Sequence, residues 1–180
     1  MTVPRRYAKA LLTLGKEDGK YKEYGDSLRG FAALLEREAE LKDALLNPIH
    51  SRDERRKLLL KVVELLQLPP FVGNLLQLLF DKHRLGVVAG VSQAYQQQVD
   101  ALENVSRAQV KAAITLDDAT RDRLRQTLEQ LTGTTVVMDV QEDPGIIGGV
   151  VARVGDLVLD GSVRTQLQSL RESLIKGEVL

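Results

Sequence analysis

Hydrophobic positions in the first hundred residues recur with the period of an α-helix. Apolar side chains fall at i, i+3, i+4 and i+7, which places them on one stripe of a helix. The pattern predicts helices at about residues 4–14, 21–36, 41–46, 51–67, 71–82 and 87–104. Pro4 suits a first helical turn, Ser51 and Glu54 form a capping-box pattern, and Pro69-Pro70 ends the fourth helix. Residues 1–104 are therefore predicted to form a six-helix bundle.

The fourth and fifth of these helices differ in their patterns. The fourth has a narrow stripe and is expected to bury Leu58, Val62 and Leu65. The fifth is apolar on most sides, with Phe71, Val72, Leu75, Leu76, Leu78, Leu79 and Phe80. Such a helix is either central in a bundle or presents one face to a partner.

After about Asn104 the period changes from 3.6 to 2, which is typical of strands. The first alternating run is expected to point Val110, Ala112, Ile114 and Leu116 inward. A helix capped by Asp117 or Asp118 follows, with Leu124, Leu128 and Leu131 on its stripe and Gly133 at its end. A second strand alternates through Val136, Met138 and Val140. We predict an α+β protein overall, with a small α+β domain at 105–180 whose helices cover one face of a mixed sheet.

Residues 143–164 carry the densest local signals in the chain. Pro144-Gly145 predicts a turn, and Gly155-Asp156 between two apolar runs predicts a two-residue hairpin. If residues 154 and 157 are paired, one face of the hairpin carries Val150, Ala152, Val154, Leu157 and Leu159, and the other carries Arg153 and Asp160. Ser162 is expected to cap a last helix that has Val163, Leu167, Leu170 and Leu174 on one side.

Charge and composition narrow the functional class. The 180 residues include 25 basic and 25 acidic side chains, divided 16 to 14 over residues 1–104 and 9 to 11 over the rest. Neither part has the positive field that nucleic-acid backbones require. There is no cysteine, no signal-peptide pattern and no apolar run long enough to span a bilayer, so a soluble protein without disulfides is expected. The aromatic residues are Tyr7, Tyr21, Tyr24, Phe31, Phe71, Phe80 and Tyr95, so the C-terminal domain must build its core from aliphatic side chains.

Candidate chemistry is sparse. His50 and His83 lack metal-ligand spacing, and the glycines at 145, 148, 149 and 155 match neither a Walker loop nor a dinucleotide fingerprint. Asp117, Asp118 and Ser162 are better explained as helix caps. The run Arg52–Lys57 interleaves both signs and is interpreted as a solvated helix face, with a basic patch as the alternative. We expect no catalytic site, no metal and no cofactor.

The first and fifth helices carry more apolar surface than the bundle needs. Tyr7, Leu11 and Leu14 on the first helix add to the broad apolar surface of the fifth. Two interpretations follow: a dense core, or a groove for an amphipathic helix of another protein.

Three motifs in order and at matching spacing resemble one known family. They are Arg6-Tyr7-Ala8-Lys9-Ala10-Leu11, the segment from Asn74-Leu75-Leu76 to Arg84-Leu85, and the block from Gly149 to Arg164. The chain resembles the delta subunit of bacterial-type F-type ATP synthase, called oligomycin-sensitivity-conferring protein in mitochondria.

The resemblance implies a non-catalytic stator subunit in the peripheral stalk, at the cytoplasmic face of the bacterial cell membrane. It implies that residues 1–104 bind the N-terminal helix of an alpha subunit of the catalytic head between the first and fifth helices. The groove residues carried over are Tyr7, Ala10, Leu11, Asn74, Leu75, Leu78 and Leu79. Residues 105–180 are implied to meet the C-terminal region of the b-subunit stalk, and the family signature there comprises Gly149, Gly155, Asp160, Gly161 and Arg164.

Two other functions, a nucleic-acid-binding regulator and a small-molecule enzyme, fit the sequence less well. A nucleic-acid-binding regulator built on a helical domain would need an uneven charge distribution, which this chain lacks. A small-molecule enzyme would need convergent ionisable groups, and the sequence offers no such set.

Overall fold

The computed structural model describes residues 2–143, 145–155 and 157–176, without the side chains of residue 169 and residues 173–176. The fold is α+β, as the hydrophobic pattern predicts. The chain forms two compact units, Met1–Val99 and Asp100–Leu180. Each unit is described by itself.

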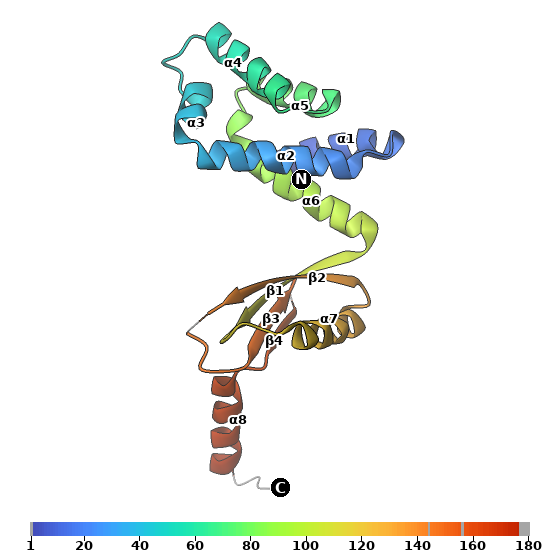
Figure 1. The fold of residues 1–180 in the computed structure, drawn as a ribbon, viewed down its shortest axis with the longest axis vertical. Coiled ribbons are helices and arrows are strands. Elements are labelled where there is room, and N and C mark those ends of the chain that lie inside the picture. The colour runs from blue at the N-terminus through green and yellow to red at the C-terminus, as the bar shows by residue number, and fades with distance from the viewer. Residues whose placement is uncertain (1, 144, 156, 177–180) are drawn as a thin grey trace. The chain divides into compact units, whose positions relative to one another are not determined.

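The first unit is helical (Figure 1). Its elements are α1 (Val3–Glu17), α2 (Tyr21–Arg37), α3 (Ala39–Leu46), α4 (Arg52–Leu65), α5 (Pro70–Asp81), the 3₁₀ turn η1 (Leu85–Val87) and α6 (Val88–Glu103), whose last residues belong to the second unit. α5 packs against α1, α2 and α4, which makes it the central helix of this unit. This position explains the buried part of its broad apolar surface, whereas Phe71 and Leu78 stay exposed.

Three aromatic side chains fill the middle of the helical core. Tyr24, Phe31 and Tyr95 are fully or almost fully buried. The Tyr95 hydroxyl donates a hydrogen bond of 2.9 Å to the carbonyl oxygen of Tyr21, and the Tyr24 hydroxyl donates to the Asp18 carboxylate. That bond lowers the pKa of Asp18 and raises the pKa of Tyr24 to about 12, while burial raises the pKa of Tyr95. The buried hydroxyls thus have partners, as burial of a polar group requires.

Local sequence sets the ends of several helices. Ser51 and Glu54 form the predicted capping box at the start of α4. α4 and α5 end in the same way, with a residue of positive φ after the helix: Gln67 at 49° and His83 at 55°. The amides of Leu68 and Arg84 then bond back to the carbonyls of Val63 and Leu79, at 3.1 and 2.8 Å. This is the Schellman arrangement, in which glycine is the residue of least steric cost.

The second unit contains a four-stranded mixed sheet of order β2-β1-β3-β4. Its strands are β1 (Val105–Ala112), β2 (Thr135–Glu142), β3 (Val150–Val154) and β4 (Leu157–Asp160). β1 and β2 are parallel and joined by α7 (Asp118–Thr132), and the other pairs are antiparallel. α7 contacts β2 and buries Leu128 against Ala108, Val110, Val136, Ala152 and Val154. Asp117 caps α7 and Gly133 ends it with a φ of 68°, so both predictions are confirmed.

The predicted hairpin register is also confirmed. Val154 is paired with Leu157 and Ala152 with Leu159, so Arg153 and Asp160 lie on the opposite face. Asp156 of the predicted turn and Pro144 of the preceding one lie outside the described residues. Gly155 has a φ of 58°, which agrees with its predicted role in the turn.

Several predictions of burial were wrong. α4 buries Leu59 and Val62 instead of Leu65, which is exposed at the end of the helix. Of the three leucines at 58–60, Leu59 is fully buried, Leu58 packs partly buried against the same core, and Leu60 is exposed. Ile114 is exposed because β1 ends at Ala112, two residues earlier, where the amide of Ala113 turns to the carbonyl of Gly149. Leu131 and Leu102 are exposed as well.

The last helix, α8 (Val163–Lys176), differs from the predicted cover of the sheet. In Figure 1 it extends away from the sheet, whereas α7 lies along it. Leu167 and Leu170 are more than half exposed.

Candidate functional site

The residues predicted to line a groove occupy two levels of the helical unit. Leu11, Leu75 and Leu79 are buried in the core. Tyr7 is half-buried, whereas Ala10, Asn74 and Leu78 are exposed. The structure brings α1 and α5 into contact and divides the predicted residues into a buried floor and an exposed layer.

The exposed layer also includes two large side chains that the hydrophobic pattern identified as surplus apolar surface but that are not among the groove residues implied by the family resemblance. Leu14 of α1 and Phe71 of α5 are 38 and 40% exposed, and Leu78 is 45% exposed. Each helix contributes positions spaced i, i+3, i+7, so each set forms a single stripe. We name this the α1/α5 surface, and its members are Tyr7, Ala10, Leu14, Phe71, Asn74 and Leu78.

Neighbouring helices hold this surface in place. The Phe71 ring packs edge-on against Tyr24 of α2, with ring centres 6.1 Å apart. Arg84, just after α5, has its Nη1 atom 3.5 Å from the Tyr7 hydroxyl. The apolar side chains thus stand on packed helices, which limits the entropy that a partner would have to remove on binding.

Helical spacing connects Leu14 and Phe71 to the groove residues implied by the family resemblance. Leu14 lies seven residues after Tyr7, and Phe71 lies three before Asn74 and seven before Leu78. The helical period therefore extends each predicted stripe by one turn.

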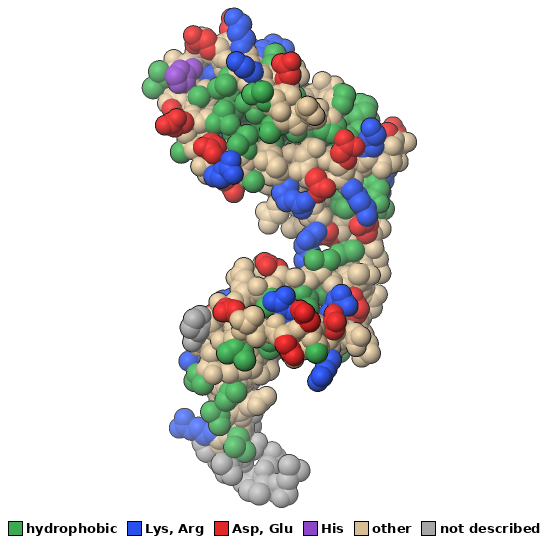
Figure 2. Space-filling view, viewed as in Figure 1, with side chains coloured by type: hydrophobic (Ala, Val, Ile, Leu, Met, Phe, Trp, Pro, Cys, Tyr) green, Lys and Arg blue, Asp and Glu red, His purple; other side chains and the backbone are tan. Residues whose placement is uncertain are grey.

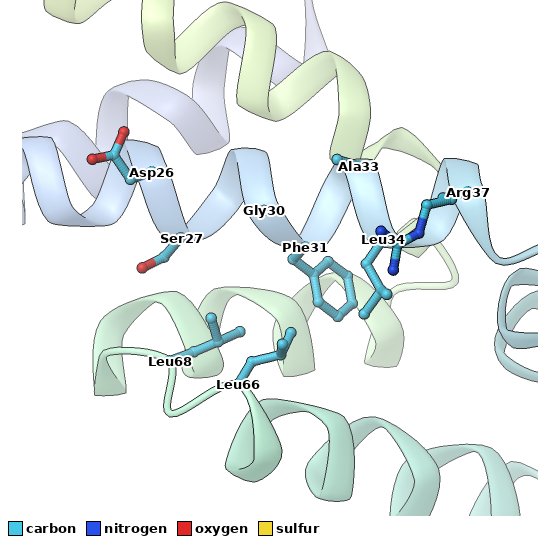
Figure 3. A pocket seen from close by; sticks show the side chains of 9 residues that line it. All are labelled: Asp26, Ser27, Gly30, Phe31, Ala33, Leu34, Arg37, Leu66 and Leu68. Carbon is cyan, nitrogen blue, oxygen red and sulfur yellow. The ribbon is translucent and has the colours of Figure 1, made fainter.

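A separate apolar hollow lies along α2. It has a volume of ≈ 490 Å³ and is lined by Asp26, Ser27, Gly30, Phe31, Ala33, Leu34, Arg37, Leu66 and Leu68. In Figure 3, Phe31 and Leu34 point from α2 toward Leu66 and Leu68 of the α4–α5 connection. No sequence pattern indicated this hollow, because its two walls are about thirty residues apart.

Three of the five predicted signature residues, Gly149, Asp160 and Gly161, lie at a junction between two loops, whereas Gly155 lies in the β3–β4 turn and Arg164 on α8. Gly149 has a φ of 86°, and a Cβ atom there would lie 2.3 Å from the carbonyl oxygen of Gly161. The amide of Gly161 donates to the carbonyl of Val150, and that of Val163 donates to the carbonyl of Gly148, both at 2.9 Å. Only glycine fits at residue 149, because any side chain would separate the loops.

Asp160 and Ser162 complete this junction at the start of α8. The Asp160 carboxylate accepts hydrogen bonds from the Ser162 amide at 2.9 Å and the Thr165 hydroxyl at 2.8 Å. These bonds, that of the Ser162 amide first, lower the pKa of Asp160. The Ser162 hydroxyl in turn accepts from the Thr165 amide at 3.3 Å, so Ser162 caps α8 as predicted. These residues fix where α8 begins and leave no free nucleophile.

α8 presents the second candidate surface. Leu167 and Leu170 are 58 and 57% exposed. A shallow hollow of ≈ 580 Å³ on this helix is lined by Arg164, Leu167, Gln168, Arg171 and Glu172. Apolar side chains three residues apart between charged neighbours are typical of a helix that packs against another helix.

The rest of the surface is mixed in charge. Figure 2 shows basic and acidic side chains interspersed over the visible face of each unit. Within the described residues, no cluster of three His, Cys, Asp or Glu side chains could hold a metal ion. Among those same residues, no helix has the length and apolar character needed to cross a membrane.

The chain is similar to known proteins over almost its whole length. Residues 3–174 match the family described as "ATP synthase delta (OSCP) subunit". The protein "ATP synthase subunit delta" of Desulfosudis oleivorans is 43% identical over 176 residues, covering 98% of this chain and 96% of the relative. That of Solidesulfovibrio magneticus is 44% identical over 178 residues, covering 98 and 97%. A chain in the structure of the Toxoplasma gondii mitochondrial ATP synthase hexamer matches the fold with a TM-score of 0.73 at 23% identity, covering 97% of this chain and 98% of that one.

Proposed function

The chain belongs to the ATP synthase delta (OSCP) subunit family, and we propose that it links the catalytic head of a bacterial F-type ATP synthase to the membrane-anchored b-subunit stalk. Membership makes it a peripheral-stalk subunit of the synthase, with a structural role and no catalytic activity of its own. Its partners are therefore other subunits of a membrane-associated complex. We also propose that it lies at the cytoplasmic face of the cell membrane and that its two units contact the alpha subunit and the b subunit.

The helical unit, predicted as a domain of residues 1–104, would bind the N-terminal helix of an alpha subunit. The observation that carries this assignment is the α1/α5 surface, where Leu14, Phe71 and Leu78 stay exposed on helices that are otherwise well packed. An amphipathic helix would place apolar anchors at i, i+3 and i+7 over these side chains. Each buried anchor contributes about 1.5–3 kcal/mol, so three can support tight binding after entropy costs.

The second unit, predicted as a domain of residues 105–180, would bind the C-terminal region of the b subunit. Support comes from the exposed Leu167 and Leu170 on α8 and from the junction that fixes the start of that helix. A helix with an uncovered apolar side is a natural partner for a helical stalk.

The proposed mechanism is mechanical. Rotation of a central stalk applies torque to the catalytic head, and a stator must stay bound while it resists that torque. Dissociation must therefore be slow, with a binding free energy on the order of −12 kcal/mol, which corresponds to nanomolar affinity.

The proposal is tested by calorimetric titration of the full chain with a peptide that represents the N-terminus of the alpha subunit. We expect saturable binding, weakened about 100-fold by Leu78→Asp, because a desolvated carboxylate replaces an apolar anchor. Leu60→Asp is the matched control, since Leu60 of α4 is 41% exposed but lies outside the α1/α5 surface. Absence of heat in the wild type would overturn the assignment. If Leu78→Asp loses helicity in far-ultraviolet circular dichroism together with binding, the dense-core interpretation is supported instead.

The proposed contact with the stalk can be tested with one variant and one control variant at equally exposed leucines. Leu167 of α8 and Leu131 of α7 are both 58% exposed. Leu167→Asp should abolish co-sedimentation with a C-terminal fragment of the b subunit, whereas Leu131→Asp should preserve it. Equal effects of the two variants would contradict the role of α8.

A further inference from the structure

A small pocket lies where the beginning of α4 meets the end of α5. It has a volume of ≈ 80 Å³ and is lined by Leu45, Leu46, Arg55, Phe80, His83 and Leu85. None of these residues belongs to the α1/α5 surface, so the pocket is independent of the proposed head contact. Beside the pocket, Arg52 on the first turn of α4 forms an ion pair of 2.9 Å with Asp81 of α5, which links the two helices.

Arg55 is the unusual member of this lining. Its guanidinium carbon lies 5.7 Å from the centre of the Phe80 ring, so one face of the cation is covered by an aromatic side chain. Its Nε atom is buried and has no hydrogen-bond partner within the described part of the chain. Leaving a buried donor of a charged group unsatisfied is costly, so an acceptor at this site would relieve a real penalty.

The electrostatic surroundings favour an anion as that acceptor. No acidic side chain is among the lining residues. The adjoining stretch 52–57 has four basic and two acidic side chains, and residues 81–84 add Lys82 and Arg84 against Asp81, which is paired with Arg52. Leu45, Leu46 and Leu85 make the other walls apolar, which strengthens any charge interaction formed there.

We propose that this pocket binds a small free oxyanion of the inorganic phosphate type. The planar fork of a guanidinium matches two oxygens of such an ion, which a halide cannot offer. The exposed His83 adds a ring N–H donor at the mouth, at a position set by the Schellman turn that ends α5. The sequence pattern predicted that the charged run Arg52–Lys57 on α4 is a solvated helix face. In this proposal one of its residues, Arg55, belongs to a binding site.

The test is a phosphate titration of the ¹⁵N-labelled full chain at constant ionic strength, with sodium chloride as the balancing salt. We expect saturable amide shifts centred on Arg55, Phe80 and His83, also given by sulfate and not by chloride. Arg55→Met, which keeps a long stem against Phe80, should weaken phosphate binding about tenfold or more. Arg56→Met, a neighbouring exposed arginine outside the pocket, should bind like the wild type.

Three outcomes would overturn the proposal. Shifts spread evenly over the basic side chains would indicate general screening, and equal loss in Arg56→Met would indicate the same. An equal response to chloride would exclude recognition of an oxyanion. If Arg55→Met fails to fold, the wild-type shift map and the chloride comparison still decide the question.

Discussion

The helical unit and the sheet unit bury different kinds of side chain. Tyr24, Phe31 and Tyr95 lie at the centre of the first, whereas Ala108, Val110 and Ala152 lie at the centre of the second. Large rings fill the space between helices, and small side chains allow α7 to approach the sheet closely. Large aromatic side chains thus contribute to the core of the first unit, whereas the core of the second is built from aliphatic side chains.

The same contrast extends to the candidate surfaces. Leu14, Phe71 and Leu78 project from helices that are packed on several sides. Leu167 and Leu170 project from α8, which is fixed mainly at its first turn by Asp160 and Ser162. The first surface is therefore preformed, and the second depends on a single junction.

The aromatic distribution makes the comparison measurable. All tyrosines and phenylalanines lie between residues 7 and 95. Tyrosine fluorescence and near-ultraviolet circular dichroism therefore report the helical unit alone, while far-ultraviolet circular dichroism reports both units. A variant can be assigned to one unit by the signal that it changes.

The largest effect is expected from Phe31→Ala. Phe31 is fully buried, so its loss removes apolar contacts and leaves a cavity. The helical unit should lose about 3–5 kcal/mol. The tyrosine-detected midpoint in urea should fall, and the later far-ultraviolet transition of the sheet unit should persist. A common shift of both transitions would show that the units unfold together.

Gly149→Ala should produce the opposite signature. The new methyl group would collide with the Gly161 carbonyl in a backbone conformation that already disfavours side chains. We expect the sheet unit to lose about 2–4 kcal/mol with the tyrosine signal unchanged. Gly155→Ala is the control: its φ is also positive but nothing lies within 4 Å, so about 1 kcal/mol is expected. Equal losses would refute the loop contact.

Acid should weaken the junction at α8 through Asp160. The Ser162 amide lowers the pKa of Asp160 below its usual 3.8, so the carboxylate stabilises the fold at higher pH. That contribution is fully present above pH 3.8 and is lost as the pH falls through the lowered value. Far-ultraviolet unfolding at about pH 6 and about pH 3 should therefore differ less in Asp160→Asn than in the wild type. Asp139→Asn, an exposed position on β2, should keep the wild-type difference.

The smallest effect, and a favourable one, is expected from Gln67→Gly. Gln67 has a φ of 49° at the end of α4, where glycine carries no steric penalty. The helical unit should gain about 0.5–1 kcal/mol, seen as a higher tyrosine-detected midpoint. Gln67→Ala keeps the steric conflict and should give no gain, so a gain in both variants would contradict the explanation.

Local features were predictable because their causes lie within a few residues. The capping box at Ser51, the cap at Asp117 and the pairing of Val154 with Leu157 each follow from short-range chemistry. The exposure of Leu65 and Ile114 was not predictable, because it depends on packing between distant segments and on where β1 leaves the sheet.

The candidate surfaces divide in the same way. The family resemblance implied Asn74 and Leu78 as groove residues, and the structure keeps both exposed. Spacing could not show that Leu11 and Leu79 are buried beneath the exposed layer, since burial depends on which helices become neighbours. The Arg55 pocket was invisible for the same reason, because its walls come from three separate segments.

The clasp between Gly148–Val150 and Gly161–Val163 has a mechanical consequence. Traction along α8 would enter the sheet through β4, which leads directly into the helix, and these paired backbone hydrogen bonds would pass part of the load to β3, which is bonded to β1 on one side and β4 on the other. The load would then be shared by many bonds in shear instead of peeling one edge strand at a time. An attachment of this kind should need a higher force to break than one held by a single edge strand.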